Sequence, residues 1–436
     1  MIKTIISSRP SGQSHVLKLA APPLPIVKIA FVGLGVRGQR AITRMLHMAG
    51  VEIVALCDIR QENTQAANRI LDEFQRPPAL EFYGKEEAWL DAVSLPQVDL
   101  VYIATDWVSH ARIAVEAMKS GKHVAVEVPA AMNMQEIWEL VDTAEKTRKH
   151  CIQLENCVYD FFELTVLNMA QQGLLGEIMH ADGGYIHFLQ QFWTSAENNW
   201  RLDYNEKFRG DIYPTHGIGP LCQAMNIHRG DKLNFLVSID TKAVGNPAFI
   251  KSQTGREVAD FRNGDHTTTI IRTQKEKTIQ IQHNIASPRP YSRMYQLTGT
   301  AGFASKYPTE AFAFMPSEYM AAYADFQPYE FIPEAMRQEL MEKYKHPILN
   351  GIEEQAKQID YRGGLNFIMD YRLIYCLQKG LPLDMDVYDL AEWCCLIPLS
   401  EMSLDAGSMP VEIPDFTRGH WNEVKGLEFA LHASDE

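Results

Sequence analysis

The chain has 436 residues, of which 46% are hydrophobic and 22% are charged, a composition typical of a globular protein with two or three domains. Its formal net charge of −14 argues against a nucleic acid or an anionic membrane as partner, because either needs a broad basic surface. No apolar run is long enough to cross a bilayer, so we expect no membrane partner and a small-molecule ligand.

Residues 1–25 are polar, and Pro22, Pro23 and Pro25 precede the first apolar run, which predicts an extended N-terminal arm on the surface. The arm lacks the apolar block and cleavage site of a signal peptide. The sequence from Met1 onward therefore predicts a cytoplasmic protein. If a signal peptide had been removed ahead of Met1, the protein would be periplasmic or exported. The seven cysteines have no C-x-x-C spacing, which favours buried free thiols over a disulfide framework or a zinc site.

Residues 27–58 follow a strand, glycine turn, helix and strand pattern that closes on an acid. Gly33, Gly35 and Gly38 come directly after an apolar run, and Asp58 follows Gly38 by 20 residues. This is the spacing of a dinucleotide-binding β-α-β unit. Three glycines after an apolar run can also form a plain α/β turn, but the acid at the expected distance favours the dinucleotide.

Each residue of this fingerprint has a physical role in the prediction. Gly33 permits the tight turn, Gly35 lets the backbone approach the pyrophosphate, and Gly38 allows close packing of helix on strand. Asp58 would accept hydrogen bonds from the adenine-side ribose and repel a 2′-phosphate, which predicts NAD rather than NADP, although Arg60 lies nearby.

Two further apolar runs, at residues 99–105 and 122–128, alternate with amphipathic helical stretches. This alternation predicts a doubly wound parallel sheet, a Rossmann domain, over residues 26–155. Ligands bind beyond the carboxyl ends of such strands, so we expect a pocket near residues 105–110 and 127–129.

The pattern changes over residues 156–436, where long runs alternate apolar and polar positions and helical stretches follow at 334–343, 364–379 and 385–404. We predict an α+β substrate-binding domain with a large open antiparallel sheet. Its exposed face would form a wall of the pocket, and its exposed edge makes a homo-oligomer plausible.

Tyr213 and His216 stand three residues apart at the start of a predicted helix, with Pro214 where a missing N–H costs little. On one face, a histidine and a tyrosine can transfer protons near neutral pH. A capping histidine and a core tyrosine are the structural alternative, and the sequence leaves both open.

Other side chains suit a sugar. Tyr185 and His187 share one face of a predicted strand, and Trp200 with Arg201 offers an aromatic surface beside a fixed cation. Packing and surface charge are the alternative for the Trp-Arg pair.

No metal-binding motif is present, and the 14 histidines are dispersed, so we predict no metal. The acidic pairs Glu86–Glu87 and Glu353–Glu354 are adjacent in sequence and would point apart on a helix. They make poor candidates for the paired carboxylates of a glycosidase.

The glycine turn, the stretch from residue 104 to 129 and the helix with His216 resemble the glucose-fructose oxidoreductase, inositol dehydrogenase and MocA superfamily over most of the chain. Dehydrogenases of that superfamily usually carry lysine, in an E-K-P motif, where this chain has Val128. That lysine helps to take the proton from the substrate hydroxyl, and its ammonium is missing here.

Within the superfamily, one combination of motifs resembles glycoside hydrolase family 109, whose members are NAD-dependent α-N-acetylgalactosaminidases. The motifs are RPSGQ, GLGVRG, EVP, GGYIH, WR, YPTHGIGP, NIHRGD and RPYSRMYQLTGT. The resemblance implies cofactor contacts at Arg37, Asp58, Trp107, His110, Glu127, Val128 and Asn156. It implies substrate contacts at Tyr185, Arg201, Tyr213, His216 and Tyr295.

The implied chemistry is oxidation of the sugar at C3 by NAD, elimination of the glycosidic oxygen, addition of water and return of the hydride, with no net redox. His216 and Tyr213 would transfer protons, with the division between them open, while Arg201, Tyr185 and Tyr295 position the sugar. The alternatives are an NAD-dependent sugar or cyclitol dehydrogenase, and a catalytically idle sugar-nucleotide sensor of the same fold.

Overall fold

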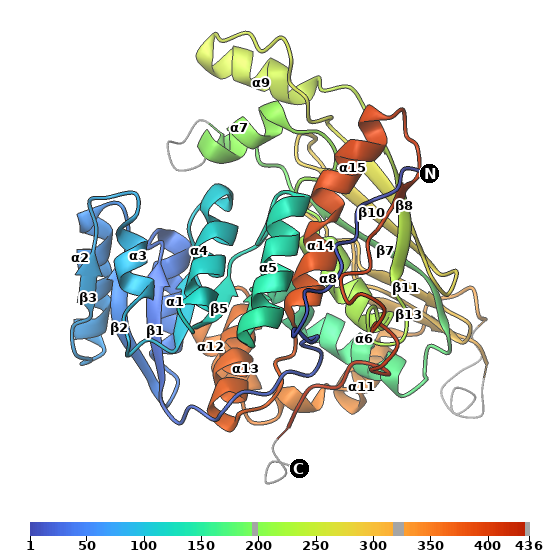
Figure 1. The fold of residues 1–436 in the computed structure, drawn as a ribbon. Coiled ribbons are helices and arrows are strands. Elements are labelled where there is room, and N and C mark those ends of the chain that lie inside the picture. The colour runs from blue at the N-terminus through green and yellow to red at the C-terminus, as the bar shows by residue number, and fades with distance from the viewer. Residues whose placement is uncertain (194–198, 317–326, 432–436) are drawn as a thin grey trace.

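The computed structural model describes residues 1–193, 199–316 and 327–431. Two sheets organise these residues, one in the N-terminal part and one in the C-terminal part (Figure 1). The first is a parallel six-stranded sheet in the order β3-β2-β1-β4-β5-β6. Its strands are β1 (Val27–Val32), β2 (Val51–Cys57), β3 (Leu80–Phe82), β4 (Leu100–Ile103), β5 (His123–Val126) and β6 (Cys151–Gln153).

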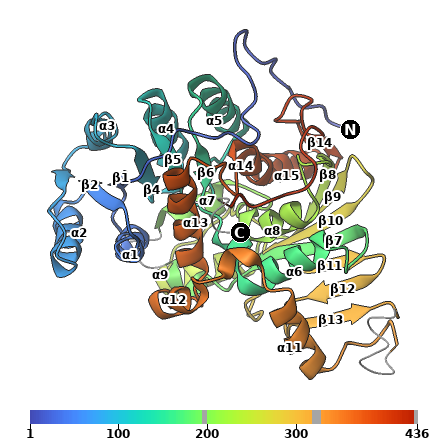
Figure 2. The same ribbon diagram turned by 90° about the horizontal axis from the view of Figure 1, so that it is seen from below.

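Helices cover both faces of this sheet, as expected for a doubly wound fold. Figure 2 shows α3, α4 and α5 on one face and α1 with α13 on the other. The cover is therefore completed by a helix from the C-terminal part of the chain. The helices of the N-terminal part are α1 (Val36–Met45), α2 (Gln61–Glu73), α3 (Ala88–Val93), α4 (Trp107–Lys119) and α5 (Met134–Thr147).

The second sheet has eight strands among the described residues, in the order β13-β12-β11-β7-β10-β9-β8-β14. Neighbouring strands are antiparallel except β7 and β10, which run parallel, so the sheet is mixed where the sequence predicted an antiparallel one. The strands are β7 (Ile178–Ile186), β8 (Leu233–Asp240), β9 (Thr267–Thr273), β10 (Thr278–Asn284), β11 (Gln296–Gly299), β12 (Gly302–Ser305), β13 (Ala311–Phe314) and β14 (Val411–Glu412).

One face of this sheet packs on helices, with α8 against β7 and α15 against β8. The described helices of the C-terminal part, α8 and α15 included, surround this layer and extend to the first domain (Figure 1). They are α6 (Phe161–Gln171), α7 (Asn199–Lys207), α8 (Thr215–Ala224), α9 (Gly245–Thr254), α11 (Glu334–Lys343), α12 (Glu353–Ile359), α13 (Leu365–Lys379), α14 (Val387–Cys394) and α15 (Leu396–Asp405).

Glycines bring α8 unusually close to β7. A Cβ added to Gly183 would lie 2.4 Å from the Gly217 carbonyl oxygen, and a Cβ on Gly217 would lie 2.5 Å from the Gly184 nitrogen. Helix and strand therefore pack backbone to backbone, which larger side chains would prevent. This contact sets the distance between His216 on the helix and Tyr185 on the strand.

The N-terminal arm lies against the C-terminal segment. Ile2 pairs with Val411 of β14, Arg9 bonds the Glu145 carboxylate of α5 at 2.9 Å, and Val16 is buried. The arm thus joins the end of the chain to the Rossmann domain (Figure 1).

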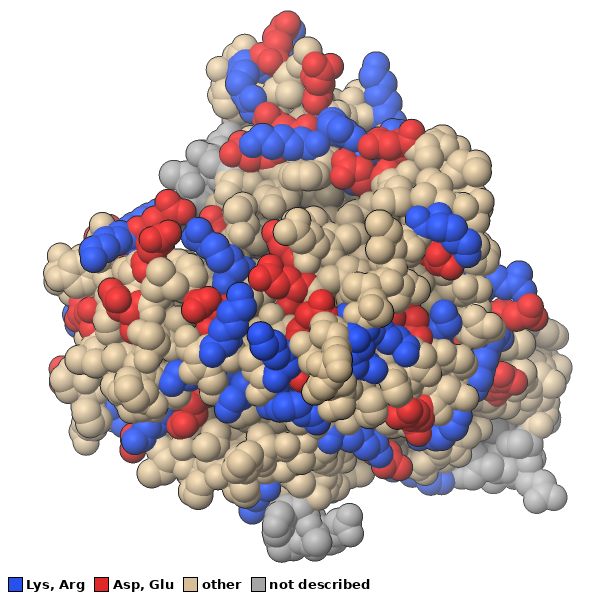
Figure 3. Space-filling model, viewed as in Figure 1, with Lys and Arg blue, Asp and Glu red and all other residues tan. Residues whose placement is uncertain are grey.

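All seven cysteines lie among the described residues, and each is buried with a free thiol. Within the same residues, no helix combines the length and apolar character that a membrane crossing needs. On the face drawn in Figure 3, basic side chains are most frequent across the lower middle, with acidic side chains between them.

Candidate active site

A cavity of about 1690 Å³ lies where the two parts of the chain meet. It begins at the glycine turn after β1, passes the ends of β4 and β5, and reaches α7, the start of α8 and the end of β7. This is the position expected for a ligand at the carboxyl ends of parallel strands. The cavity is large enough for a dinucleotide and a second, smaller molecule.

The glycine turn is shaped for close approach of backbone to ligand. Gly33 has φ of +90°, and a Cβ there would lie 2.5 Å from the Ala104 carbonyl carbon, so only glycine fits. A Cβ on Gly38 would lie 2.1 Å from the Gly33 carbonyl oxygen. Gly35 has no atom within 4 Å of its Cβ position and lines the cavity, which leaves room for a pyrophosphate.

Asp58 lies at the tip of β2 and lines the cavity. Its Oδ2 accepts the Leu34 backbone N–H at 2.7 Å, and its Oδ1 accepts the Arg60 N–H at 2.9 Å. The carboxylate is therefore held against the glycine turn, and each oxygen keeps a lone pair for a ribose hydroxyl. These residues fit the adenine-side ribose of NAD.

Arg37 and Glu127 form a pair across the cavity. Arg37 Nε donates to Glu127 Oε1 at 3.0 Å, and Nη2 donates to Oε2 at 2.9 Å, an arrangement that uses both carboxylate oxygens. The charge of Glu127 raises the pKa of the Arg37 guanidinium above its ordinary value. Val128, next along the chain, is buried at the cavity wall and supplies no charge.

Trp107, His110 and Asn156 also line the cavity and are almost fully buried. His110 Nδ1 lies 2.9 Å from the Pro129 carbonyl oxygen and Nε2 lies 3.1 Å from that of Thr105. The ring therefore lies between the two strand-end loops. Burial lowers the pKa of His110, against the effect of the two carbonyl oxygens, and a neutral ring can donate to only one of them.

An aromatic cluster with one histidine forms the other half of the cavity. The ring centroids of Tyr213 and His216 are 5.1 Å apart, those of Tyr185 and Tyr213 are 4.7 Å apart, and those of Trp107 and Tyr213 are 5.5 Å apart. The Arg201 guanidinium lies 5.8 Å from the Tyr213 ring centre and 5.2 Å from that of Trp107. The structure thus brings together four of the five predicted substrate residues.

Two of the tyrosines that line the cavity, Tyr213 and Tyr185, are held as protonated phenols. Burial raises the pKa of Tyr213 well above its ordinary value, even though the charge of Arg201 lowers it. Burial likewise raises the pKa of Tyr185, whose hydroxyl lies 2.9 Å from His187 Nδ1. Either tyrosine can therefore donate a hydrogen bond but is a poor base at neutral pH.

His216 has a buried partner that the sequence did not indicate. Its Nδ1 lies 2.6 Å from Oε1 of Glu155, whose side chain has no exposed surface. Tyr213 lies just before α8 rather than within it, and Thr215 is the first residue of the helix.

Tyr295 does not lie where the resemblance implied. It is 2% exposed, packs edge-on to Phe162 with ring centroids 6.1 Å apart, and is not among the cavity-lining residues. The backbone has φ of +62° at Met294 and +44° at Tyr295, a turn that directs Tyr295 into the core. Tyr291, four residues earlier, lines the cavity instead and is 48% exposed.

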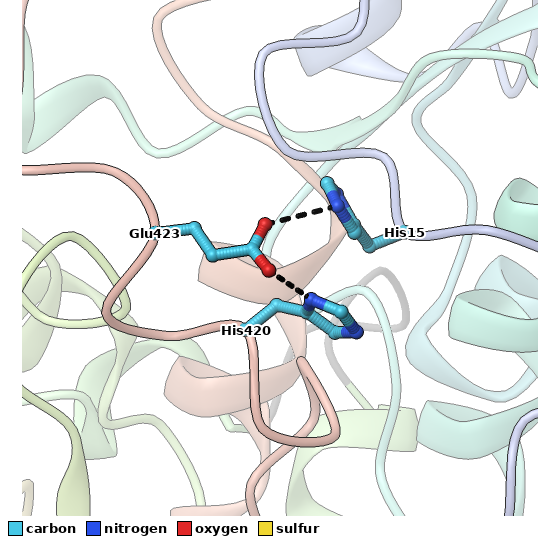
Figure 4. A group of neighbouring side chains, drawn as sticks. All are labelled: His15, His420 and Glu423. Atoms are coloured by element: carbon cyan, nitrogen blue, oxygen red, sulfur yellow. Dashed lines mark hydrogen bonds and ion pairs between the residues drawn. The ribbon is translucent and has the colours of Figure 1, made fainter.

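Three groups of side chains have the spacing of metal ligands among the described residues. Figure 4 shows one of them, where His15 Nε2 lies 3.1 Å and His420 Nδ1 lies 2.5 Å from the Glu423 carboxylate. Arg9 Nη1 lies 2.9 Å from His420 Nε2, and because arginine can only donate, that nitrogen must accept. Nδ1 then donates its proton to the Glu423 carboxylate.

The other two groups are linked by their own hydrogen bonds. Cys157 stands beside Glu155 and His216, and burial raises the pKa of its thiol well above the ordinary value. In the third group, burial opposes ionisation of His228, yet the carboxylates around it, including Glu392, raise its pKa to about 10.

Comparison with known proteins agrees with this geometry. The family model "Oxidoreductase family, NAD-binding Rossmann fold" matches residues 27–154, and "Glycosyl hydrolase 109, C-terminal domain" matches residues 159–423. The chain belongs to glycosyl hydrolase family 109. A family 109 protein of Bacteroides fragilis (strain YCH46) is 55% identical over 434 residues, which cover 99% of this chain and 94% of the relative.

Solved structures show the same fold at low identity. An NAD binding oxidoreductase from Klebsiella pneumoniae superposes with a TM-score of 0.65 and 16% identity, over 89% of this chain and 100% of the other. The WlbA dehydrogenase from Bordetella pertussis, solved with NADH and UDP-GlcNAcA, superposes with a TM-score of 0.63 and 15% identity, over 89% of this chain and 98% of the other. This family 109 protein is therefore an enzyme of a glycoside hydrolase family with an NAD-binding Rossmann domain, and its cofactor is NAD.

Proposed function

We propose that this family 109 enzyme hydrolyses α-N-acetylgalactosaminides through transient oxidation of the sugar at C3, with no net redox change. The observation that carries the proposal is the position of Tyr213, His216 and Arg201 in the same cavity as the NAD-binding turn. Proton-transfer groups and the dinucleotide site thus face a single substrate volume.

The carboxylates near this half of the cavity support the same reaction class. Two of the carboxylates that line the cavity are held in ion pairs: Glu127 is paired with Arg37, and Asp160 lies 2.8 Å from Arg293 and 2.6 Å from Lys306. A glycosidase that uses two carboxylates needs one as a proton donor and the other as a base or nucleophile. Carboxylates held in ion pairs suit neither role.

The Gly33 turn, Asp58, Arg37 and the strand-end residues would hold NAD, which would supply reversible hydride transfer at C3 of the sugar. A C3 ketone acidifies the neighbouring C2 hydrogen, whose removal expels the glycosidic oxygen from C1. Water then adds at C1 and a proton returns to C2.

The residue roles follow from the states of the side chains. We assign removal of the C2 proton to His216, because burial keeps Tyr213 and Tyr185 as phenols. The Tyr213 hydroxyl is placed to donate to oxygen atoms that gain negative charge, and Arg201 adds a fixed positive charge beside it. Tyr185 and Trp107 would form the walls against the sugar ring.

The test uses the purified protein without added cofactor and aryl N-acetylgalactosaminides of both anomers. The proposal predicts many turnovers of aryl release from the α-anomer with no build-up of reduced-nicotinamide absorbance. Reduced nicotinamide formed in proportion to product would show a dehydrogenase instead and contradict the proposal. A His216→Gln variant should lose turnover while retaining NAD, and activity that survives in it would refute the role of His216.

A further inference from the structure

Glu155 holds the catalytic histidine from inside the protein. It is the second residue after β6, has no exposed side-chain surface and is not among the residues that line the cavity. Its Oε1 lies 2.6 Å from His216 Nδ1 and also accepts the Cys157 backbone N–H at 3.0 Å. The carboxylate is therefore fixed by its own backbone and by the histidine together.

We propose that Glu155 is a positioning residue that fixes the Nδ1–H tautomer of His216 and leaves Nε2 as the basic atom in the cavity; this assignment rests on the function proposed above. An ionised carboxylate only accepts hydrogen bonds, so the proton between the two side chains belongs to Nδ1. In a neutral imidazole the other nitrogen then carries the lone pair. Among the described residues, His216 Nε2 has no hydrogen-bond partner, so that lone pair is available to take a proton from the substrate.

Burial raises the pKa of Glu155, but the charge and hydrogen bond of His216 and the Cys157 N–H outweigh burial, so the net pKa is lowered. Glu155 is therefore an anion at neutral pH. When His216 takes a proton at Nε2, the imidazolium forms 2.6 Å from this anion. The carboxylate is thus placed to stabilise the positive charge that proton transfer creates.

The packing of α8 leaves room for this carboxylate. Gly219 lies three residues after His216, on the same side of the helix. A Cβ on Gly219 would lie 3.1 Å from Glu155 Cγ and 3.3 Å from the Trp393 ring. Helix α8 therefore presents the histidine and the space for its partner one turn apart.

A buried Glu–His bond could also be a purely structural tie between β6 and α8, and pH dependence separates the two roles. Glu155→Gln keeps the shape of the side chain and removes its charge. We expect kcat to fall about 100-fold, with KM and retained NAD within about twofold of wild type. The acidic limb of the kcat/KM profile should move at least about half a pH unit lower, because the base loses its anionic neighbour. Glu155→Asp, which keeps the charge, should bring that limb back toward wild type.

Glu145→Gln is the matched control. Glu145 is also buried and bonds Arg9, Arg418 and Tyr388, but it lies outside the cavity lining. We expect it to lower the thermal midpoint without moving the acidic limb. An acidic limb that stays in place in Glu155→Gln, or moves equally in the control, would overturn the proposal.

A substrate-free readout separates this proposal from the proposed function. In protein with ¹⁵N-labelled histidine, the His216 signal, assigned with His216→Gln, should report a proton on Nδ1 in wild type. A proton on Nε2 in wild type would overturn the tautomer assignment even if every variant unfolded. An enzyme that shows the Nδ1 proton but does not cleave the galactosaminide would refute the proposed function and leave the Glu155–His216 assignment standing.

Discussion

Arg37 and Glu127 connect the glycine turn to the end of β5 by two hydrogen bonds, at 3.0 and 2.9 Å. Arg37 belongs to the first turn of α1, and Glu127 follows the last residue of β5. The pair therefore joins the glycine turn, which would hold the pyrophosphate, to the strand end next to Val128 in the cavity wall. It keeps a buried carboxylate from facing the cavity unpaired, which is costly in a site of low polarity.

Replacing Arg37 by alanine should weaken NAD binding about tenfold, since both a cation and the partner of Glu127 are lost. The dissociation constant can be followed by quenching of protein fluorescence. Arg69→Ala, an exposed arginine on α2, is the control and should bind NAD as wild type does. If Arg37→Ala binds NAD with unchanged affinity, Arg37 has no role in holding the cofactor.

The glycines of the turn predict two different losses. A Cβ at Gly35 meets open space in the cavity, so Gly35→Ala should leave the melting temperature of the NAD-free protein within about 2 °C. It should nevertheless reduce NAD retention, because the methyl group occupies the space of the pyrophosphate. Gly38→Ala should lower both the melting temperature and NAD retention, because its Cβ would lie 2.1 Å from the Gly33 carbonyl oxygen. Equal behaviour of the two variants in both assays would contradict this distinction.

The resemblance implied that Tyr295 contacts the substrate, whereas the structure predicts that Tyr291, in the same RPYSRMYQ segment, makes the contact. Tyr291 lines the cavity edge-on to His187, with ring centroids 5.1 Å apart, so Tyr291→Ala should raise KM several-fold. Tyr295→Phe removes only a buried hydroxyl without a partner among the described residues, so kcat and KM should stay near wild type. A large kinetic effect of Tyr295→Phe would restore Tyr295 as a substrate contact and show the core placement to be wrong for the active state.

His283 predicts a pH dependence of stability. Burial, with the charge of His266, lowers the pKa of His283 to about 3, and neither ring nitrogen has a partner among the described residues. An unfolded histidine takes up its proton near pH 6.5, so the unfolded state binds more protons as the pH falls from about 6.5 toward 3. The unfolding free energy contributed by His283 is therefore lost on acidification through that window.

His283→Phe removes this titration while keeping a ring. Between pH 6 and pH 4 the unfolding free energy of this variant should fall less steeply than that of wild type. The two slopes should differ by about 1.4 kcal/mol per pH unit. Urea titrations at several pH values would measure the difference. Parallel pH slopes for the two proteins would mean that His283 titrates normally in the folded state.

The parts that the sequence predicted well are local in the chain. Gly33, Gly38 and Asp58 belong to one contiguous β-α-β unit, so their spacing alone indicates the turn, the helix packing and the acid at the strand tip. Tyr213 and His216 could be paired for the same reason, since they stand three residues apart in the chain, although Tyr213 lies just before α8 rather than within it.

The parts that the sequence missed depend on contacts between distant segments. Glu155 and His216 are 61 positions apart, and only the packing of α8 beside η1 (Asn156–Tyr159) brings them within bonding distance. The parallel pairing of β7 with β10 could not be predicted either, because apolar and polar residues alternate in the same way in parallel and antiparallel strands. The left-handed turn at Met294 and Tyr295 decides which tyrosine reaches the cavity, and neither residue type signals it.

The central claim is that the C2 hydrogen of the sugar is removed and replaced during hydrolysis. Turnover of an aryl α-N-acetylgalactosaminide in D₂O, followed by mass and proton spectra of the released sugar, tests it directly. The account predicts deuterium at C2 in the product of every turnover, which direct displacement at C1 would not introduce. A released sugar with its C2 hydrogen fully retained would contradict the account.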